Sequence, residues 1–421
     1  LCVKPSDGSG DFDFSRNSAA TRVNAQGLVE NVQILSSNLV QNPSFSEEGV
    51  QEVSNGSFSQ EGSELITNGD FSSDTDWTKG TGWSIGGGTA NCDGTQTSNS
   101  SLRSQTFVVG SNPTLKLTFD VVNYSSGLLA AGITGTGQAD ITNINANGTY
   151  SVIVVSSTGN RLVDFVADAD FIGSIENCSV REVGQDWNLG SGWSIAEDKA
   201  VATNSASGQK LRQAGQLTAS KTYKLVYEVT ELTLGGFLPI VGAVQGTAVY
   251  SIGTYTEYIT TTNDDFYIRT LGTTSGSITN ISVKEVGMDW VLFSGWSIGN
   301  DKVVGDGTAF TDVSQTPILI QNKKVKLTFD VLDYVSGTFR IPPSDRQDGL
   351  DERFSGNGSY EVIYTSTVPY FRFQQQALAG SITNISVIEI TTDTNLPRIN
   401  YEGFSYQDVL GSEQIVNGSF E

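Results

Sequence analysis

One short stretch, TFRIPPSDRQDGLDERF, which begins at Thr338, is dense in charged side chains. The candidate ligand contacts within it are Arg340, Asp345, Arg346, Asp348, Asp351 and Arg353. Guanidinium groups donate several hydrogen bonds and carboxylates accept several, which suits a ligand rich in hydroxyl groups. A glycan is therefore the ligand class that this stretch indicates. The alternative, which the ordinary behaviour of surface loops favours, is a solvated loop without a ligand.

A second group of acids, in DGSGDFD from Asp7, places oxygen ligands at alternate positions, as a calcium loop does. Asp7, Asp11 and Asp13 are the candidate calcium ligands. The stretch lacks the rest of a twelve-position loop and its terminal Glu. A solvated acidic turn is the alternative that this missing half favours, so no cofactor is expected beyond this calcium candidate.

Catalytic chemistry is restricted because the chain contains no histidine. A Ser-His-Asp triad, a Cys-His pair and a histidine-ligated metal site are therefore excluded. A two-carboxylate glycosidase needs only two facing acids, and the chain has 46 Asp and Glu residues. Acids nevertheless recur at equivalent places in three repeats, as in Asp120, Glu228 and Asp330, which indicates scaffold positions. We expect no catalytic residue and no enzyme activity.

The tryptophans reveal the repeats that position these residues. All six lie in three pairs with a spacing of six, within DWTKGTGWSI from Asp76, DWNLGSGWSI from Asp186 and DWVLFSGWSI from Asp289. Each stretch predicts a tryptophan-rich hairpin that opens a structural unit. Flat indole faces can stack on sugars, but a pair fixed in every unit favours a place in the core.

Each unit continues with runs in which apolar and polar residues alternate, such as LKLTFDVVNYSSG from Leu115, and ends with a closing motif such as GSITNISVKEVG from Gly276. Alternating runs with turn signals over about a hundred residues predict an antiparallel β-sandwich. The predicted fold class is all-β, with tandem jelly-roll-like sandwich modules and a small element formed by both flanks. The predicted divisions are an N-terminal fibre-like element and linker at 1–63, modules at 64–184, 185–287 and 288–390, and a C-terminal flank at 391–421 that starts a further repeat.

Charge and composition limit the partners. Lys and Arg number 24 against 46 Asp and Glu, a net charge of −22 that repels nucleic acid and anionic membranes. No apolar stretch approaches the roughly 20 residues that span a bilayer. The three cysteines, Cys2, Cys92 and Cys178, have no metal-site spacing, and repeat alignment places the last two among small core residues.

A shorter motif recurs in the N-terminal region and at the end, as NLVQNPSFS from Asn38, EVSNGSFS from Glu52, ELITNGDFS from Glu64 and QIVNGSFE from Gln414. The last copy opens a unit that the sequence does not complete, so we expect the natural chain to continue past Glu421. NGDFSSDTDW followed by a sandwich-like repeat resembles the opening of jelly-roll carbohydrate-binding modules of phage and glycan-degrading proteins.

A further resemblance involves both flanks. FDFSRNSAATRVNAQGLVENV from Phe12 and LPRINYEGF from Leu396 resemble paired motifs of tail-fibre-like structural proteins of marine bacteriophages. In that family the two motifs lie close in sequence, whereas three modules separate them here, so we expect the modules to be an insertion.

This resemblance implies a virion structural protein of a tail fibre or similar appendage, located on the virion surface, with a role in host attachment. Implied partners are other virion proteins, a host-surface glycan and copies of the same chain, with a homotrimer common among such fibres. The alternatives are a carbohydrate-binding surface or secreted protein with an extracellular location, and the non-catalytic part of a glycan hydrolase.

Overall fold

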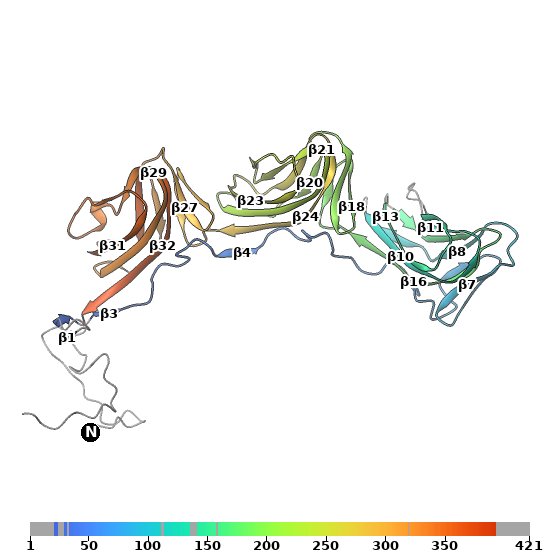
Figure 1. Ribbon diagram of the computed structural model, residues 1–421. Coiled ribbons are helices and arrows are strands. Elements are labelled where there is room, and N and C mark those ends of the chain that lie inside the picture. Colours follow the sequence, from blue (N-terminus) through green and yellow to red (C-terminus); the bar gives the residue numbers. More distant parts are fainter. Residues whose placement is uncertain are drawn as a thin grey trace, which may run out of the picture. The chain divides into compact units, whose positions relative to one another are not determined.

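The computed structural model of the protein describes residues 21–23, 29–31, 33–110, 113–134, 141–156, 159–318 and 320–392. Within these ranges every strand pairing is antiparallel, and one 3-10 turn, η1 (Pro343–Asp345), is the only helical element. The predicted all-β fold of tandem antiparallel sandwiches is confirmed. Contacts divide the chain into two compact units, one of Leu1–Glu47 with Gly287–Glu421 and one of Glu48–Val286. The second unit contains the first two modules, and the first unit contains the third module (Figure 1).

The first module is a sandwich of two five-stranded sheets. Its first sheet, in the order β13-β10-β16-β7-β6, contains β6 (Trp83–Gly86), β7 (Thr89–Asp93), β10 (Thr114–Ser126), β13 (Gly148–Val155) and β16 (Ile172–Val183). Its second sheet, in the order β12-β11-β15-β8-β5, contains β5 (Trp77–Lys79), β8 (Ser100–Ser104), β11 (Leu129–Ile133), β12 (Ile141–Ile144) and β15 (Val163–Ala167). A separate pair joins β9 (Phe107–Val109) to β14 (Gly159–Arg161).

The second module repeats this arrangement with longer strands. It contains β17 (Asn188–Leu189), β18 (Trp193–Ala196), β19 (Lys199–Ser205), β20 (Lys210–Gln213), β21 (Thr222–Val241), β22 (Val244–Gln245), β23 (Gly253–Thr260) and β24 (Phe266–Val286). The first half of β21 pairs with β23 and its second half with β22, so one strand serves both sheets. Irregular pairing with β24 marks the crossing between the sheets.

The third module has the same strand order and carries one insertion. It contains β25 (Val291–Leu292), β26 (Trp296–Gly299), β27 (Lys302–Asp306), β28 (Asp312–Gln315), β29 (Lys324–Arg340), β30 (Arg353–Phe354), β31 (Gly358–Thr365) and β32 (Phe371–Thr392). The turn η1 lies between β29 and β30. The insertion therefore begins where β29 ends, within the charged stretch identified from the sequence.

The core of each module consists of the inward-facing residues of both sheets, as strand alternation requires. All six tryptophans are buried, with exposed fractions of 5 to 7%. The prediction that they belong to the core is confirmed, and the alternative of exposed sugar-stacking faces is wrong for these residues. The predicted tryptophan hairpin is also wrong, because β5 pairs with β8 in one sheet while β6 pairs with β7 in the other. The stretch from the first to the second tryptophan of the pair thus connects the two sheets of the sandwich.

The cysteines of the first module agree with their predicted places. Cys92 and Cys178 are buried and free. Burial raises the pKa of both thiols, and Cys92 lies opposite Trp83 just as Ala202 lies opposite Trp193. Cys2 lies outside the described residues.

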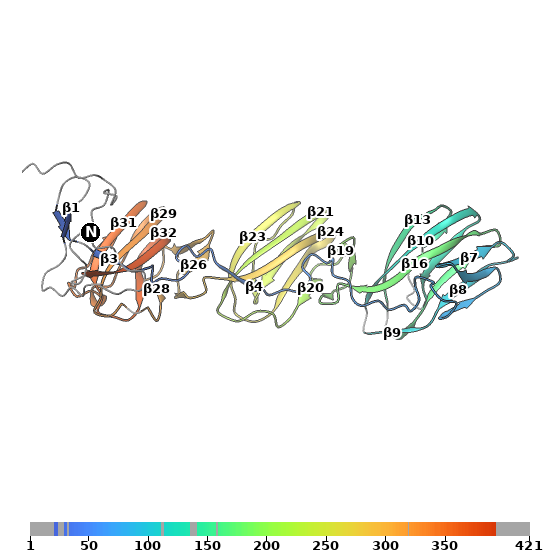
Figure 2. The same ribbon diagram turned by 90° about the horizontal axis from the view of Figure 1, so that it is seen from below.

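The N-terminal segment contributes to the modules in reverse order. Its small strands are β1 (Thr21–Val23), β2 (Val29–Asn31), β3 (Gln33–Leu35) and β4 (Glu48–Gln51). Strand β3 pairs with the end of β32 in the third module, and β4 pairs with the end of β24 in the second, where Figure 2 shows it beside β24. Glu61 forms a bridge with Val183 at the end of the first module. Described parts of the stretch predicted as an N-terminal element and linker thus pair with sheets of the modules, whereas its residues 1–20, 24–28 and 32 lie outside the described residues.

Three eight-residue stretches of this segment, which we call clips, contact the modules in the same way. Clip 1 is residues 38–45, clip 2 is residues 51–58 and clip 3 is residues 64–71. Each ends in a fully buried phenylalanine that packs against the first tryptophan of its module. The ring centroids are 4.9 Å apart for Phe45 and Trp290, 5.1 Å for Phe58 and Trp187, and 4.9 Å for Phe71 and Trp77.

The same tryptophans also anchor the clip backbone. The indole N–H of Trp290 donates to the carbonyl oxygen of Asn42 at 3.1 Å, and Trp187 and Trp77 donate to Asn55 and Asn68 at 3.0 Å. Asn42, Asn55 and Asn68, and the three clip phenylalanines, have positive φ. Asparagine tolerates this conformation, whereas phenylalanine is held in it at a cost, so the buried contacts must outweigh that strain.

Candidate ligand-binding surface on the third module

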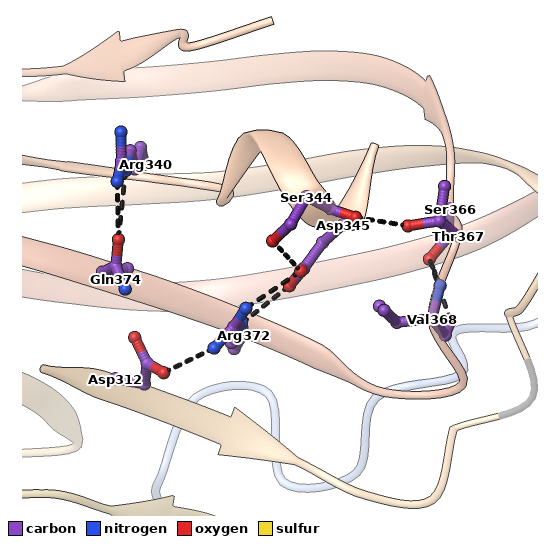
Figure 3. Close-up of polar contacts among 9 residues, drawn as sticks. All are labelled: Asp312, Arg340, Ser344, Asp345, Ser366, Thr367, Val368, Arg372 and Gln374. Carbon is purple, nitrogen blue, oxygen red and sulfur yellow. Dashed lines mark hydrogen bonds and ion pairs between the residues drawn. The ribbon is translucent and has the colours of Figure 1, made fainter. Parts of the chain in front are cut away.

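The charged stretch lies over one face of the second sheet of the third module. Along β32 the buried Phe371, Phe373 and Gln375 alternate with the half-buried Arg372 and Gln374. Successive side chains of a strand point to opposite faces, so Arg372 and Gln374 project away from the core. Asp312 and Arg340 lie opposite Gln374 in the neighbouring strands. The outer face of this sheet is therefore polar (Figure 3).

An ion-pair network holds the insertion against this face. Arg372 contacts both carboxylate oxygens of Asp345, at 2.7 and 2.9 Å, and contacts Asp312 at 2.8 Å (Figure 3). The Asp345 carboxylate and then the Asp312 carboxylate raise the pKa of Arg372. Asp345 is only 3% exposed, so the removal of Arg372 would leave a buried carboxylate without this ion pair. The network fixes η1 against β32.

Arg346 forms a second anchor for the same insertion. Its guanidinium is 3% exposed and makes two 2.9 Å bonds to Asp348 and one 2.9 Å bond to Glu352. It also lies 5.4 Å from the centre of the Tyr364 ring. The pairing holds the pKa of Asp348 below its usual value. Arg346 is thus fully engaged within the protein, which makes it a positioning group for the loop.

The groups left accessible form a smaller patch, which we call the Arg340 surface: Phe310, Arg340, Asp351, Arg353 and Gln374. Arg340 bonds Asp351 at 2.7 Å and Gln374 at 2.8 and 3.1 Å, and Arg353 bonds the other oxygen of Asp351 at 2.7 Å. The Phe310 ring is 58% exposed and its centre lies 5.7 Å from the Arg340 guanidinium. Hydrogen bonds from Arg340 first and Arg353 second lower the pKa of Asp351.

This arrangement combines an exposed ring with charged donors and acceptors. The flat face of an aromatic ring packs against the apolar face of a ligand, while the guanidinium and carboxylate groups can bond its hydroxyls. Arg340 is held in place by Asp351 and Gln374, so little of its side-chain freedom remains to be lost on binding. The geometry suits a polar ligand that also has an apolar face.

The six residues selected from the sequence therefore divide into two groups. Asp345 and Arg346 are buried and hold the insertion, whereas Arg340, Asp348, Asp351 and Arg353 border solvent. Their contact with a ligand stays a prediction. Phe310 and Gln374 were missed, although the alternation in FRFQQQ from Phe371 could have indicated the polar face of that strand.

The equivalent faces of the other two modules carry different residues. In the first module Arg103 pairs with Asp164 at 3.0 Å. In the second module Arg212 pairs with Asp265 at 2.8 Å, and Lys210 lies 4.1 Å from the centre of the Tyr267 ring. A charged pair thus recurs in each module, but the η1 insertion and the Arg340 surface belong to the third.

The recurring acids that the sequence assigned to the scaffold bond within their own modules. Asp120 accepts hydrogen bonds from Thr149 and Asn177, at 2.6 and 2.8 Å. Asn280 donates to Glu228 at 2.9 Å in the second module. Asp330 accepts from Ser359 and Asn384 at 2.5 and 2.7 Å in the third. These bonds link neighbouring strands and agree with the scaffold interpretation.

The remaining predicted sites are not represented in the described structure. Asp7, Asp11 and Asp13 lie outside the described residues. Among the residues that are described, no group of three or more His, Cys, Asp and Glu side chains is arranged to hold a metal ion. Over the same ranges, no helix has the length and apolar character needed to cross a membrane.

Comparison with known proteins gives structural matches only. No family model and no curated protein matches the sequence. The N-terminal CBM22-1–CBM22-2 tandem domain of Paenibacillus barcinonensis Xyn10C is similar over 54% of this chain and 99% of that chain, with 9% identity and a TM-score of 0.20. A GH2 β-galacturonidase from Eisenbergiella tayi bound to galacturonate is similar over 50% of this chain and 39% of that chain, with 12% identity and a TM-score of 0.17. These values are too low to support an argument about function.

Proposed function

We propose that this protein is a non-enzymatic adhesin whose third module binds a glycan at the Arg340 surface. The observation that carries the proposal is the exposed Phe310 ring beside the Arg340, Asp351 and Arg353 charges. A sugar ring has one face of C–H groups and an edge of hydroxyls, so it complements an aromatic ring flanked by fixed donors and acceptors.

The charges at this surface support the proposal of binding without catalysis. A glycosidase needs one carboxyl group with a raised pKa that donates a proton, next to a second, ionised carboxylate. Hydrogen bonds from Arg340 and then Arg353 instead lower the pKa of Asp351 at this surface, and Arg346 lowers that of Asp348, which lies beside the surface in the insertion. Both groups are therefore suited to accept hydrogen bonds from hydroxyls, and neither is suited to protonate a leaving group.

The setting that we propose is a virion appendage such as a bacteriophage tail fibre. The support is the resemblance of the stretches from Phe12 and Leu396 to motifs of tail-fibre-like proteins, together with the tandem modules. The stretch from Phe12 is described only in part, and the stretch from Leu396 lies wholly outside the described residues. Electron microscopy of native particles, labelled with an antibody to the third module, tests this setting separately from glycan binding. Labelled fibres on virions are expected, and labelling of a soluble protein alone would contradict it.

Glycan binding is tested with the full chain on a glycan array, followed by titration calorimetry with the best ligand. Phe310→Ala should weaken binding by at least about tenfold, the equivalent of about 1.4 kcal/mol, because the ring supplies the apolar contact. The variant should keep its melting temperature since Phe310 is largely exposed.

Val335→Ala is the matched control, because Val335 is 78% exposed in the same module and is not part of the Arg340 surface. It should bind as the unaltered chain does. Absence of binding to any glycan, or equal binding by the Phe310→Ala chain, would refute the proposed surface.

A further inference from the structure

The three clips share a pattern that extends beyond the asparagine and phenylalanine. Four residues before the asparagine, each clip has a side-chain oxygen acceptor, and two residues before it each has a buried β-branched residue. In clip 2 these residues are Gln51 and Val53, followed by Asn55 and Phe58. The corresponding acceptors of clips 1 and 3 are Asn38 and Glu64, and the corresponding buried residues are Val40 and Ile66.

The last strand of each module, β16, β24 or β32, forms backbone hydrogen bonds with the residues of this pattern. In the second module the N–H of Val283 donates to the side chain of Gln51 at 2.9 Å, and its carbonyl accepts from the N–H of Glu52 at 2.9 Å. The N–H of Ile281 donates to the carbonyl of Gly56 at 2.9 Å. The matching bonds of the other modules involve Val387 with Asn38 at 2.9 Å and Val180 with Glu64 at 2.8 Å.

We call the surface of each module that its clip covers the groove. In the second and third modules a glutamine side chain of the groove also bonds the clip. The amide of Gln213 accepts from the N–H of Ser54 at 3.0 Å and donates to its carbonyl at 2.7 Å. Gln315 makes the same two bonds with Gln41, at 2.8 and 3.0 Å. With the indole N–H and the ring contact, these bonds define a site for an eight-residue peptide. In each site the module contacts mainly backbone groups of the clip, together with the four residues of the shared pattern: the oxygen acceptor, the β-branched residue, the asparagine and the phenylalanine.

A fourth copy of the pattern has no such site among the described modules. GSEQIVNGSF from Gly411 matches GSELITNGDF from Gly62, and both have Glu, Ile, Asn and Phe at the four recognised positions. Its NGSF is identical to residues 55–58 of clip 2. Residues 411–420 lie outside the described part of the chain, whereas the three grooves of this chain are each filled by a clip of the same chain.

We infer that the grooves are peptide-binding sites and that residues 413–420 are a docking peptide for one. A receptor for this peptide needs the features of these grooves, namely the first tryptophan and the last strand of such a module, and a groove that no clip of its own fills. A wild-type copy of this chain is not the receptor, because its tethered clips occupy all three grooves at a high effective concentration. Docking of this peptide would add a module by the same contacts that hold the first three.

The first experiment tests whether the peptide fits a groove, using three full-length chains that all carry Phe420→Ala. The first keeps clip 2, and the second has a Gly/Ser sequence of equal length in its place. The third carries the octapeptide EQIVNGSF in clip 2, which requires the substitutions Gln51→Glu, Glu52→Gln, Val53→Ile and Ser54→Val. The third chain should melt within a few degrees of the first, and the Gly/Ser chain should melt well below both. Melting of the third chain with the Gly/Ser chain would overturn the inference.

The second experiment tests binding between molecules. A labelled peptide of residues 409–421 is titrated into the Gly/Ser chain, with fluorescence polarisation as the readout. Saturable binding at least about tenfold tighter than that of the same peptide with Phe420→Ala is expected. The chain with clip 2 intact should not bind. Equal binding by both chains, or no binding by a Gly/Ser chain that keeps its near-ultraviolet circular dichroism, would overturn the inference. If that chain does not fold, the melting comparison alone decides.

Discussion

Replacement of Phe58 by alanine tests the structural role of the clips directly. The Phe58 side chain is 1% exposed and packs against Trp187, within the cluster that forms the core of the second module. Truncation of a buried phenylalanine removes its transfer free energy and leaves a cavity, which together cost about 3 to 5 kcal/mol. Phe58→Ala should therefore lower the free energy of unfolding of the second module by this amount.

Differential scanning calorimetry measures this effect. A loss of 1 kcal/mol lowers the melting temperature of a domain of this size by roughly 4 °C or more, so the expected shift is at least about 12 °C. Val50→Ala, at a 77% exposed position of the same segment, is the control and should leave the melting temperature unchanged. A shift below about 4 °C for Phe58→Ala would show that the clip lies on the module surface without contributing to its core, and would refute the assignment of Phe58 to that core.

Two further perturbations test the ion pairs. Arg372→Met leaves the buried Asp345 carboxylate without its guanidinium partner, so urea unfolding should show a free energy of unfolding lower by about 3 to 5 kcal/mol. Arg353→Met removes an exposed ion pair and should lower it by less than about 1 kcal/mol. Equal effects of the two substitutions would contradict the assignment of Arg372 to a buried ion pair. Hydrogen bonds from Lys224 and then Lys284 lower the pKa of Glu48 in the folded chain. These bonds therefore stabilise the fold fully above the pKa of Glu48 in the unfolded chain, about 4.3. Their contribution is lost as the pH falls through the lower pKa of the folded chain. Glu48→Gln should therefore lower the melting temperature near pH 7 but not in acid where Glu48 is protonated in both the folded and the unfolded chain. Glu47→Gln is the neighbouring control, and a difference that persists in such acid would refute the ion-pair origin.

The strands of the modules could be predicted from the sequence because their signals are local. LKLTFDVVNYSSG alternates at period two, and the structure has β10 at Thr114–Ser126. The closing motif of the first module, GSIENCSVREVG from Gly173, lies in β16, at Ile172–Val183. Period-two alternation reports which face of a strand is buried, and that property requires no knowledge of the partner.

The clips could not be assigned from the sequence because their partners are distant. The recurrence of the NxxF motif was visible, but nothing local connects Asn42 with Trp290, which are 248 residues apart. The tryptophan hairpin failed for a related reason, since spacing alone does not reveal that Trp77 and Trp83 enter different sheets. Likewise, the charge density of the insertion pointed to a polar site, but burial decided that Asp345 and Arg346 serve the scaffold.

The clips occur in the reverse order of the modules that they contact, so their docking closes loops of very different lengths. Trp77 contacts a clip residue only 9 positions away, whereas the contacts of Trp187 and Trp290 span 132 and 248 residues. Loop-closure cost rises only with the logarithm of length, so the longest span costs only about 0.6 kcal/mol more than the intermediate one. Moreover, once clip 3 is docked, clip 2 is tethered thirteen residues before it and the second module begins directly after the first. Each docking event therefore shortens the effective loop for the next, and the nested order lets one N-terminal segment contribute a clip to each module in turn.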